Sequence, residues 1–397
     1  MIASITSGVI IFIFGASIAA MFYTYVLFPL ILKWLSANKK FENIRYEQSS
    51  ELPFISVLIS AYNEQDVIEK KINSIYHTTY PADKFEVLIG SDASDDLTDS
   101  IIRLLTSRYN SLKFFPFTQR SGKGNVINRL YEKSKGSILV FTDANVMLEE
   151  SSLFELVKYF KDSKIGLVDS QMINTNLQTH GISFQEKAYI SREVKIKQAE
   201  SLLWGTMMGP FGGCFAIKKE LYTPVPKNFL VDDFFINMTI LEKGYKCINN
   251  LEARVYEDVS NNLADEFKRK IRIATGNFQN LHKFSNLLFH QTKGLSFCFI
   301  SHKVLRWFGP FFIILALVSN FILAFHNEFF FTILILQLLI LVLPLIDLLL
   351  KMVNVHIHIL RLVTHFYTMN VALMIGFFKS LQNIETNVWK PTQRNQN

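Results

Sequence analysis

The sequence predicts an α/β domain with a mostly parallel sheet, flanked by transmembrane helices. Three observations carry this prediction. Strand-like apolar runs alternate with amphipathic helical stretches between about residues 52 and 280, a rhythm typical of βαβ units. Long apolar runs with few or no charged residues occupy both ends of the chain. Four of the strand-like runs end in acidic residues, and the carboxyl ends of parallel strands gather at one edge of a sheet.

Hydrophobic residues are distributed unevenly along the chain. Of its 397 residues 49% are hydrophobic, and the mean hydropathy is +0.21, values unlike those of an ordinary soluble enzyme. We therefore expect four parts. They are an N-terminal transmembrane anchor (1–35), a cytoplasmic α/β domain (52–285), interfacial and transmembrane helices (286–380) and a polar C-terminal tail (381–397).

The first apolar run covers residues 9–32 and reaches the length of about 20 residues that a helix needs to cross a bilayer. A cleaved signal peptide normally opens with positive charge, whereas here Lys33, Lys39 and Lys40 follow the run. This pattern favours a retained anchor. The positive-inside rule places the N-terminus outside and the central domain in the cytoplasm, at the cell (inner) membrane.

Three more apolar runs, residues 308–325, 329–350 and 359–378, follow the central region. A full third crossing would leave the basic C-terminal residues outside, against the positive-inside rule. The sequence leaves two membrane topologies open. Either the last run is re-entrant or interfacial, or residues 287–300 also enter the membrane interface.

The formal net charge is +7, and much of the excess lies beside the apolar runs, where it suits an anionic lipid surface. No basic stripe with interleaved aromatic residues is present in the sequence, so we expect membrane lipids and no nucleic acid as partners. Cys214, Cys247 and Cys298 have neither metal-ligand spacing nor the pattern of a disulfide framework. They are expected to be reduced thiols.

The central region opens with four predicted strands and three predicted helices. The strands are expected at residues 55–60, 86–90, 112–117 and 137–142. The helices are expected at residues 64–77, 97–109 and 124–134. Every acidic cluster of this region follows a strand, which is where ligands bind in a parallel α/β sheet.

The second strand leads into Asp92-Ala93-Ser94-Asp95-Asp96. Asp95 and Asp96 stand where an N-cap residue would satisfy free amides at the start of the next helix. Asp92 lies too early for that cap, and we expect it to contact a nucleotide. Gly122-Lys123-Gly124 precedes a helix and suits an anion, although the spacing of a P-loop is absent.

The fourth strand delivers Asp143-Ala144-Asn145 to the sheet edge. Residues i and i+2 of an extended strand point the same way, so Asp143 and Asn145 are candidates to share one divalent ion. Mg²⁺ needs only one or two protein carboxylates when substrate phosphates complete its shell. An Asx-turn is the structural alternative.

Asp232-Asp233 opens a predicted helix over residues 234–243. One of these carboxylates is expected to cap the helix and the other to act as a base towards a bound hydroxyl. The glycine-rich residues 209–213 read as a loop on which a substrate could lie. The basic residues 268–272 form either a solvated helix face or a clamp in which Arg272 binds a diphosphate.

The order of these motifs resembles glycosyltransferase family 2, especially its membrane-bound branch of cellulose, chitin, hyaluronan and poly-N-acetylglucosamine synthase-like enzymes. The resemblance covers about residues 52–280. The matching motifs are the nucleotide loop Ser60-Ala61-Tyr62-Asn63-Glu64, the nucleotide-contacting Asp92, the basic Lys123, the DxD-like Asp143-Ala144-Asn145, and Asp233 in the place of the TED base.

The resemblance implies a GT-A fold, the Rossmann-like fold of nucleotide-diphospho-sugar transferases, and an inverting hexosyl transfer. The donor is expected to be a nucleotide-sugar, a UDP-sugar before GDP-mannose, bound with Mg²⁺ or Mn²⁺. The acceptor is a saccharide or lipid-linked group in polysaccharide or glycoconjugate synthesis. The implied nucleotide contacts are Ala61, Tyr62, Glu64, Asp92, Lys123, Arg269 and Arg272; the metal ligands are Asp143 and Asn145; the base is Asp233; and the acceptor contacts are Gly212, Gly213 and Asp232.

Two departures from the family pattern matter. Asn145 replaces the second acid of the DxD motif, so metal binding depends more heavily on Asp143. The QxxRW motif of processive synthases aligns with residues 269–273, which keep Arg272 but lack the Gln and Trp. The missing Trp favours single transfer over polymerisation. The two departures also leave open a catalytically inactive, sugar-nucleotide-binding subunit of a polysaccharide synthesis or export complex.

Overall fold

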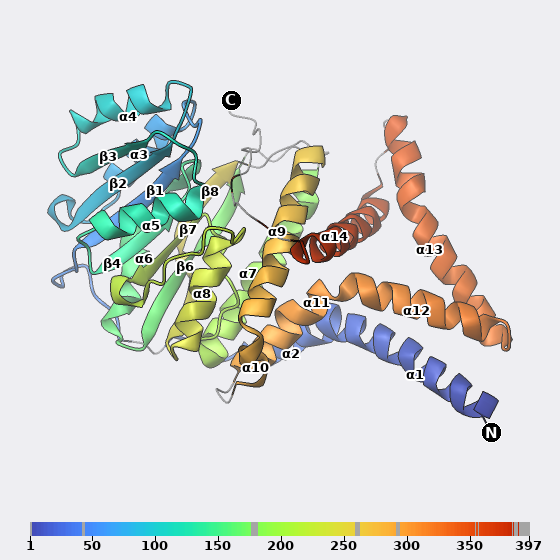
Figure 1. Cartoon of the computed structure of the whole chain (residues 1–397). Helices are drawn as coiled ribbons and strands as arrows, with labels where there is room; N and C mark the ends of the chain where they lie inside the picture. The colour runs from blue at the N-terminus through green and yellow to red at the C-terminus, as the bar shows by residue number, and fades with distance from the viewer. Residues whose placement is uncertain are drawn as a thin grey trace.

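Figure 1 shows the computed structural model of the chain, in which a sheet with helices on both faces lies at one end and long apolar helices project from the other. The residues described are 2–41, 44–175, 182–258, 263–290, 294–353, 355, 357–382, 384 and 388. Helices α7 and α9 lie between these two parts of the molecule.

The core of the sheet domain is one eight-stranded sheet with the order β3-β2-β1-β4-β7-β6-β8-β5. Strands β1, β2, β3, β4, β6 and β8 run in the same direction, whereas β5 and β7 pair antiparallel to their neighbours. The predicted mostly parallel sheet is therefore confirmed. The strands are β1 (Ile55–Ala61), β2 (Phe85–Asp92), β3 (Leu112–Phe117), β4 (Ile138–Thr142), β5 (Val146–Leu148), β6 (Ile165–Thr175), β7 (Cys214–Lys218) and β8 (Lys246–Asp258).

Helices cover both faces of this sheet. The helices of the sheet domain are α3 (Ile68–Tyr76), α4 (Thr98–Thr106), α5 (Lys123–Lys133), α6 (Ser152–Val157), α7 (Ile182–Trp204), α8 (Asp232–Glu242) and α9 (Leu263–Lys283). Short single turns occupy η2 (Ala82–Lys84), η3 (Lys158–Lys161), η4 (Lys219–Leu221) and η5 (Ser285–Phe289). Strands buried on both faces read as continuous apolar runs, and β2 is buried at every position.

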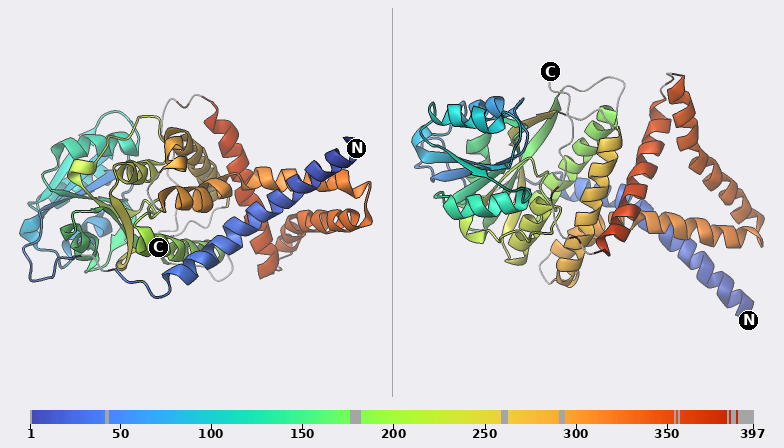
Figure 2. Two further views of the ribbon diagram at one scale, coloured as in Figure 1. Left: turned by 90° about the horizontal axis from the view of Figure 1, so that it is seen from below. Right: turned by 45° about the horizontal axis from the view of Figure 1, so that its top comes forward.

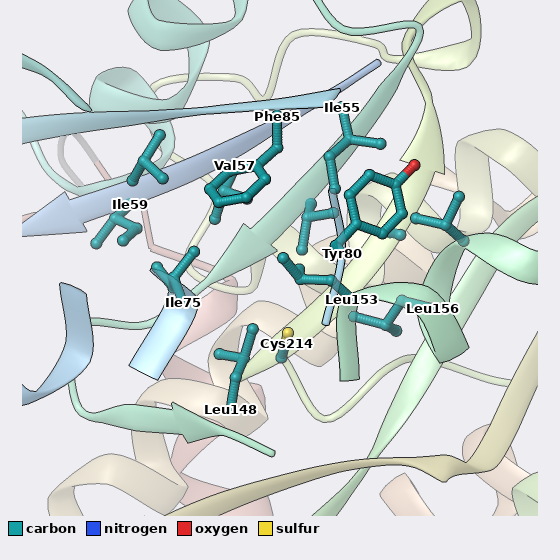
Figure 3. Packing of buried hydrophobic residues seen from close by; sticks show 14 of the residues in the cluster. Ile55, Val57, Ile59, Ile75, Tyr80, Phe85, Leu148, Leu153, Leu156 and Cys214 are labelled. Atoms are coloured by element: carbon teal, nitrogen blue, oxygen red, sulfur yellow. The ribbon is translucent and has the colours of Figure 1, made fainter. Parts of the chain in front are cut away.

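The alternation of side chains along β1 divides the core into two layers. Ile55, Val57 and Ile59 pack with residues of α3, α4 and α6 on one face, and Figure 3 shows this packing around Phe85 and Tyr80. Leu58 points to the other face and packs with residues of α5 and α8. Because successive strand side chains alternate between faces, each helix layer receives its own apolar surface.

The four strands predicted between residues 55 and 142 agree with β1 to β4 to within two residues. The strand-like run at residues 229–231, before Asp232, is not a strand in the structure, and one predicted helix begins too early. The helix expected from residue 64 starts at Ile68. The amide of Glu64 instead donates to Oγ1 of Thr98 at 2.8 Å, which ties the loop after β1 to the start of α4. Tertiary contacts therefore override the helical pattern of the sequence at this point.

The apolar ends form helices of membrane-spanning length. The N-terminal span, Ser7–Ser36, is built from α1 (Ile2–Phe22), the π-helical η1 (Tyr23–Leu27) and α2 (Phe28–Ser36). The other long spans are α13 (Glu328–Met352) and α14 (His358–Ser380). A fourth candidate, bent by 60°, combines Leu295–Trp307 with α12 (Gly309–Ala324). Its first half contains α10 (Leu295–Cys298), the π-helical η6 (Phe299–Val304) and α11 (Leu305–Trp307).

The N-terminal span and the bent pair pack together. Helices α1 and α12 run side by side away from the sheet domain (Figures 1 and 2). Where the two π-helical segments meet, Oγ1 of Thr24 donates to the carbonyl of Ser301 at 2.8 Å. The ring nitrogens of the next residue, His302, lie 2.7 Å from Glu193 and 2.6 Å from Glu200 of α7. These bonds fix the apolar helices to the sheet domain.

The first prediction concerns the tight entry to β4. A Cβ atom on Gly136 would lie 2.8 Å from Cα of Ile55 and closer still to the amide of Ser56. We expect Gly136→Ala to destabilise the protein by about 1–3 kcal/mol, because backbone atoms must shift. The measurement is the apparent Tm in detergent. Gly15→Ala is the control, since nothing lies within 4 Å of its Cβ position; an unchanged Tm in the Gly136 variant would contradict this packing.

Candidate active site

The loops that carry the sequence-predicted site residues converge on one edge of the sheet. The parallel strands β1, β2 and β4 end there, and β7 begins there because it runs in the opposite direction. The carbonyl of Gly213, just before β7, accepts hydrogen bonds from the amide of Asp143 and from Oγ1 of Thr142, both at 3.0 Å. The reversed strand thus brings the glycine-rich loop against the Asp143–Asn145 loop.

Lys123 is the cation at the centre of this edge. Its Nζ lies 2.7 Å from Oδ1 of Asp143 and 3.8 Å from Oδ2 of Asp232. Burial alone would lower the pKa of this lysine, but the carboxylates of Asp143 and Asp232 outweigh burial and raise it. Lys123 therefore stays charged at neutral pH and joins the start of α5, the loop after β4 and the start of α8.

Asp233 is a buried carboxyl group of this cluster whose proton affinity is raised. Burial and the neighbouring charge of Asp232 raise its pKa to about 6, although Lys123 acts in the opposite direction. One of its oxygens accepts a hydrogen bond from the amide of Phe234 at 2.7 Å. A carboxylate with a pKa just below neutral pH is suited to act as a general base.

Gly212 is required for the close approach of the glycine-rich loop to Asp233. A Cβ atom at this position would lie 3.2 Å from Cγ of Asp233 and would overlap its carboxylate oxygen. The backbone φ of Gly212 is +80°, which glycine adopts without the steric cost of a side chain. The structure therefore brings the loop of Gly212 and Gly213 against the Asp232–Asp233 pair, and their expected contact with an acceptor stays a prediction.

The predicted metal ligands lie next to each other but have different partners. Asp143 pairs with Lys123, whereas the side-chain amide of Asn145 donates to Oε1 of Glu257 at 3.2 Å. Across the residues that the structure describes, no three His, Cys, Asp or Glu side chains form a closed metal site. One carboxylate with a neighbouring amide oxygen still fits Mg²⁺ or Mn²⁺, because water and diphosphate oxygens complete the shell of such an ion.

Asp92 has protein partners that its sequence position did not reveal. The side chain is 2% exposed, and its carboxylate accepts hydrogen bonds from the amides of Ser121 at 2.7 Å and Gly122 at 2.9 Å. These bonds shape the turn from which Lys123 projects. Its expected contact with a nucleotide stays a prediction.

Tyr62 forms an aromatic surface beside Asp92. The guanidinium carbon of Arg120 lies 3.5 Å from the centroid of the Tyr62 ring, and Nε of Arg120 lies 3.8 Å from Asp92. Arg120 was not identified as a site residue from the sequence, because it lies after β3 in a segment without a recognisable motif. Its position before Gly122 and Lys123 was the available signal. Ala61 ends β1, which places it and Tyr62 at the same edge of the sheet.

The loops after β1 and β2 are held together in strained conformations. Asn63 and Ala93 have φ values of 54° and 60°, which are uncommon for residues other than glycine and occur often at functional sites. Neither Asp95 nor Asp96 occupies the N-cap position of α4, which is Leu97. Asp96 nevertheless satisfies a free amide at the start of the helix, because it accepts a hydrogen bond from the amide of Thr98 at 2.9 Å. The carboxylate of Asp95 instead accepts from the side chain of Asn63.

Helix α9 supplies the predicted arginines. Nη1 of Arg272 donates to the carbonyl of Leu230 at 2.8 Å, just before the Asp232–Asp233 pair. Burial and the nearby Arg269 lower the pKa of Arg272, while the carboxylates of this edge oppose the shift. Arg269 donates to Glu266 at 3.1 Å. The structure therefore places Arg272 beside the acidic cluster, with Arg269 one helical turn away.

The sheet topology and this edge cluster define a GT-A fold. A family model described as "Glycosyl transferase family group 2" matches residues 142–375, and "Glycosyl transferase family 2" matches residues 56–223. The chain belongs to glycosyltransferase family 2.

Known proteins similar to this chain support the same fold and family. Beta-monoglucosyldiacylglycerol synthase of Trichormus variabilis is 28% identical over 161 residues, covering 40% of this chain and 34% of that protein. Poly-beta-1,6-N-acetyl-D-glucosamine synthase of Staphylococcus aureus is 23% identical over 66% of each chain. The chain thus spans about a third of the first of these relatives and just under two thirds of the second.

A solved structure matches nearly the whole chain. It is the mannosyltransferase PcManGT from Pyrobaculum calidifontis, in complex with GDP-Man and Mn²⁺. The TM-score is 0.73 at 23% identity, and the match covers 93% of this chain and 98% of that one. The similarity in fold therefore includes the apolar helices as well as the sheet domain.

The raised pKa of Asp233 predicts that its ionised form destabilises the folded protein above about pH 6. Its value of about 6 lies above the 3.8 of an ordinary aspartate, so the folded protein binds this proton more tightly than the unfolded chain. The resulting stability is complete below about pH 4 and is lost as the pH rises through about 6. We expect Asp233→Asn to stabilise the protein at pH 7.5 by up to about 3 kcal/mol.

Thermal unfolding in detergent between pH 4 and pH 8 measures this effect. The gain of Asp233→Asn over the wild type should shrink towards zero at the acidic end of the range. Asp83→Asn is the matched control, because Asp83 is exposed far from the cluster. A difference that does not depend on pH would contradict the assigned pKa.

Proposed function

We propose that this protein is a membrane-bound, inverting, metal-dependent glycosyltransferase that moves a hexosyl group from a nucleotide-sugar to a saccharide or lipid-linked acceptor. The observation that carries the proposal is the meeting of Lys123, Asp143 and Asp233 at one edge of the sheet in a chain of family 2. The product belongs to polysaccharide or glycolipid synthesis. UDP-sugars are the first donors to test, and GDP-mannose the second.

The donor diphosphate would bind where Lys123 now meets Asp143. Asp143 and the side-chain oxygen of Asn145 would hold Mg²⁺ or Mn²⁺, which when bound offsets negative charge on the leaving diphosphate. Lys123 would then be available to a phosphate oxygen, and Arg272 offers a second cation from α9. Tyr62, with Arg120 stacked on its ring, Ala61 and Glu64 border the nucleotide side.

Asp233 would take the proton of the acceptor hydroxyl. At pH 7 a carboxyl group with a pKa of about 6 is mostly ionised, and its proton affinity is still higher than that of an exposed aspartate. The acceptor oxygen bonds to the anomeric carbon as the bond to the diphosphate oxygen breaks on the opposite face, which inverts the anomeric configuration. Lys123 cannot be the base, because its raised pKa keeps it protonated.

One specific feature supports the alternative of an inactive sugar-nucleotide-binding subunit. Asn145 brings no charge to the metal position, and its amide is engaged by Glu257. The raised pKa of Asp233 favours an enzyme, because a binding subunit needs no general base. Transfer assays with purified protein separate the two functions.

Two substitutions should separate binding from chemistry. Asp143→Ala should abolish the Mn²⁺-dependent part of nucleotide binding, because it removes the only carboxylate of the proposed metal pair. Asp233→Asn should keep that binding and lower kcat by about 10²–10⁴-fold, the usual contribution of a general base. Binding calorimetry with UDP and GDP, and release of the nucleotide from a panel of donors, measure the two effects.

Glu242→Gln serves as the control for both variants, since it lies at the far end of α8. It should bind and turn over like the wild type. Full activity in the Asp233→Asn enzyme would remove the base assignment. Nucleotide binding without turnover of any donor by the wild type would favour the inactive subunit.

The proposed cytoplasmic position of the sheet domain can be tested by cysteine labelling. The three native cysteines are buried, so background labelling should be low. Lys39→Cys, after the N-terminal span, should react with an impermeant maleimide only in permeabilised cells. Asn327→Cys, between α12 and α13, should react in intact cells, and the opposite pattern would reverse the orientation.

A further inference from the structure

Lys71 is a buried lysine of α3 that no motif of the sequence marks. The residue is fully buried. Its ammonium donates to Oγ1 of Thr142 at 2.7 Å and to the carbonyl oxygen of Val146. Both bonds lead to the same short segment of the chain.

The two partners of Lys71 are the ends of the loop that carries Asp143 and Asn145. Thr142 is the last residue of β4, and Val146 is the first residue of β5. A single ammonium therefore binds both ends of this loop, while the Asp143 side chain pairs with Lys123 at the sheet edge. One turn further along α3, Oγ of Ser74 accepts a hydrogen bond from the amide of Leu148 at 3.3 Å, which holds the other end of β5.

Through Thr142, Lys71 is also linked to the glycine-rich loop on the proposed acceptor side of the site. The hydroxyl that accepts from Lys71 donates in turn to the carbonyl of Gly213 at 3.0 Å. The amide of Asp143 donates to the same carbonyl. Two hydrogen bonds therefore set the position of Asp143 relative to the glycine-rich loop, and one of them comes from the Thr142 hydroxyl that Lys71 holds in place.

An ammonium is an expensive group to bury at this position. Burial lowers the pKa of Lys71 to about 8, although Cys214 and Asp143 act in the opposite direction. An apolar side chain of the same length would fill the space without that desolvation cost. We therefore expect the buried charge to have a function. The two hydrogen bonds to Thr142 and Val146 indicate that this function is to fix the ends of the Asp143–Asn145 loop.

We propose that Lys71 is a positioning residue for the divalent-cation and diphosphate site, acting through the loop ends at Thr142 and Val146. The inference rests on the proposed function, because it concerns the same site. Groups that orient metal ligands from behind typically change metal affinity by about 10–100-fold when they are removed. Lys71 should have an effect of that size on the cation and a much smaller one on the nucleotide alone.

The test compares two adjacent lysines of one helix. Lys71→Met removes the buried ammonium, and Lys70→Met removes its exposed neighbour. Full-length protein in detergent is titrated with Mn²⁺ in the presence of UDP, and nucleotide affinity is measured again in EDTA. We expect Lys71→Met to raise the Mn²⁺ concentration at half-maximal effect by about 10–100-fold, with affinity in EDTA unchanged. Lys70→Met should match the wild type.

A second variant keeps the inference testable if Lys71→Met does not fold. Thr142→Val removes the hydroxyl between Lys71 and Gly213 with little change in shape, and should also weaken the Mn²⁺ response by about tenfold. Equal Mn²⁺ responses in the wild type and in these variants would overturn the positioning role of Lys71 and leave the proposed function intact. Nucleotide binding to the wild type that ignores Mn²⁺ overturns the proposed function and the inference together.

Discussion

The ion pair between Lys123 and Asp143 is the interaction on which the site depends. It joins the start of α5 to the loop after β4, and Asp232 at the start of α8 lies 3.8 Å from the same ammonium. Without a cation between them, carboxylates gathered at one sheet edge would repel each other and raise their pKa values. Lys123 therefore allows the acidic residues to converge before any ligand binds.

This arrangement explains how one site could serve both donor and acceptor. A divalent ion on Asp143 would replace the lysine as its cation, and the lysine would turn to a phosphate of the donor. Asp233 takes no part in this exchange and lies against Gly212, on the side where we propose that the acceptor binds. Its raised pKa comes from burial and from Asp232, so the same carboxylate cluster that attracts the cation would also tune the proposed base.

Much of the fold could be predicted from the sequence, because its signals are local. Apolar β-rich runs located β1, β3 and β4, and apolar runs of about 20 residues located the candidate spans. The reversed direction of β7 could not be predicted, since it depends on pairing with β4 and β6, which are distant in sequence. That reversal is what brings Gly212 and Gly213 to the site.

The side chains behind the site were harder to predict than those in it. Lys71 reads as part of a solvated Lys-Lys pair, yet it lies three residues after Ile68 and four before Ile75, on the buried face of α3. Helical spacing was thus the signal that could have identified it. The partners of Asp92 and Asn145 could not be found in this way, because Ser121 and Glu257 reach them only through the tertiary fold.

The most direct test of the central claim is an experimental structure of the full-length protein with UDP and Mn²⁺. The predicted result is Mn²⁺ bound to Asp143 and to the diphosphate, with the ammonium of Lys123 moved from Asp143 to a phosphate oxygen and Asp233 free of the metal. A complex in which the Lys123–Asp143 pair is intact and the nucleotide lies elsewhere would contradict it.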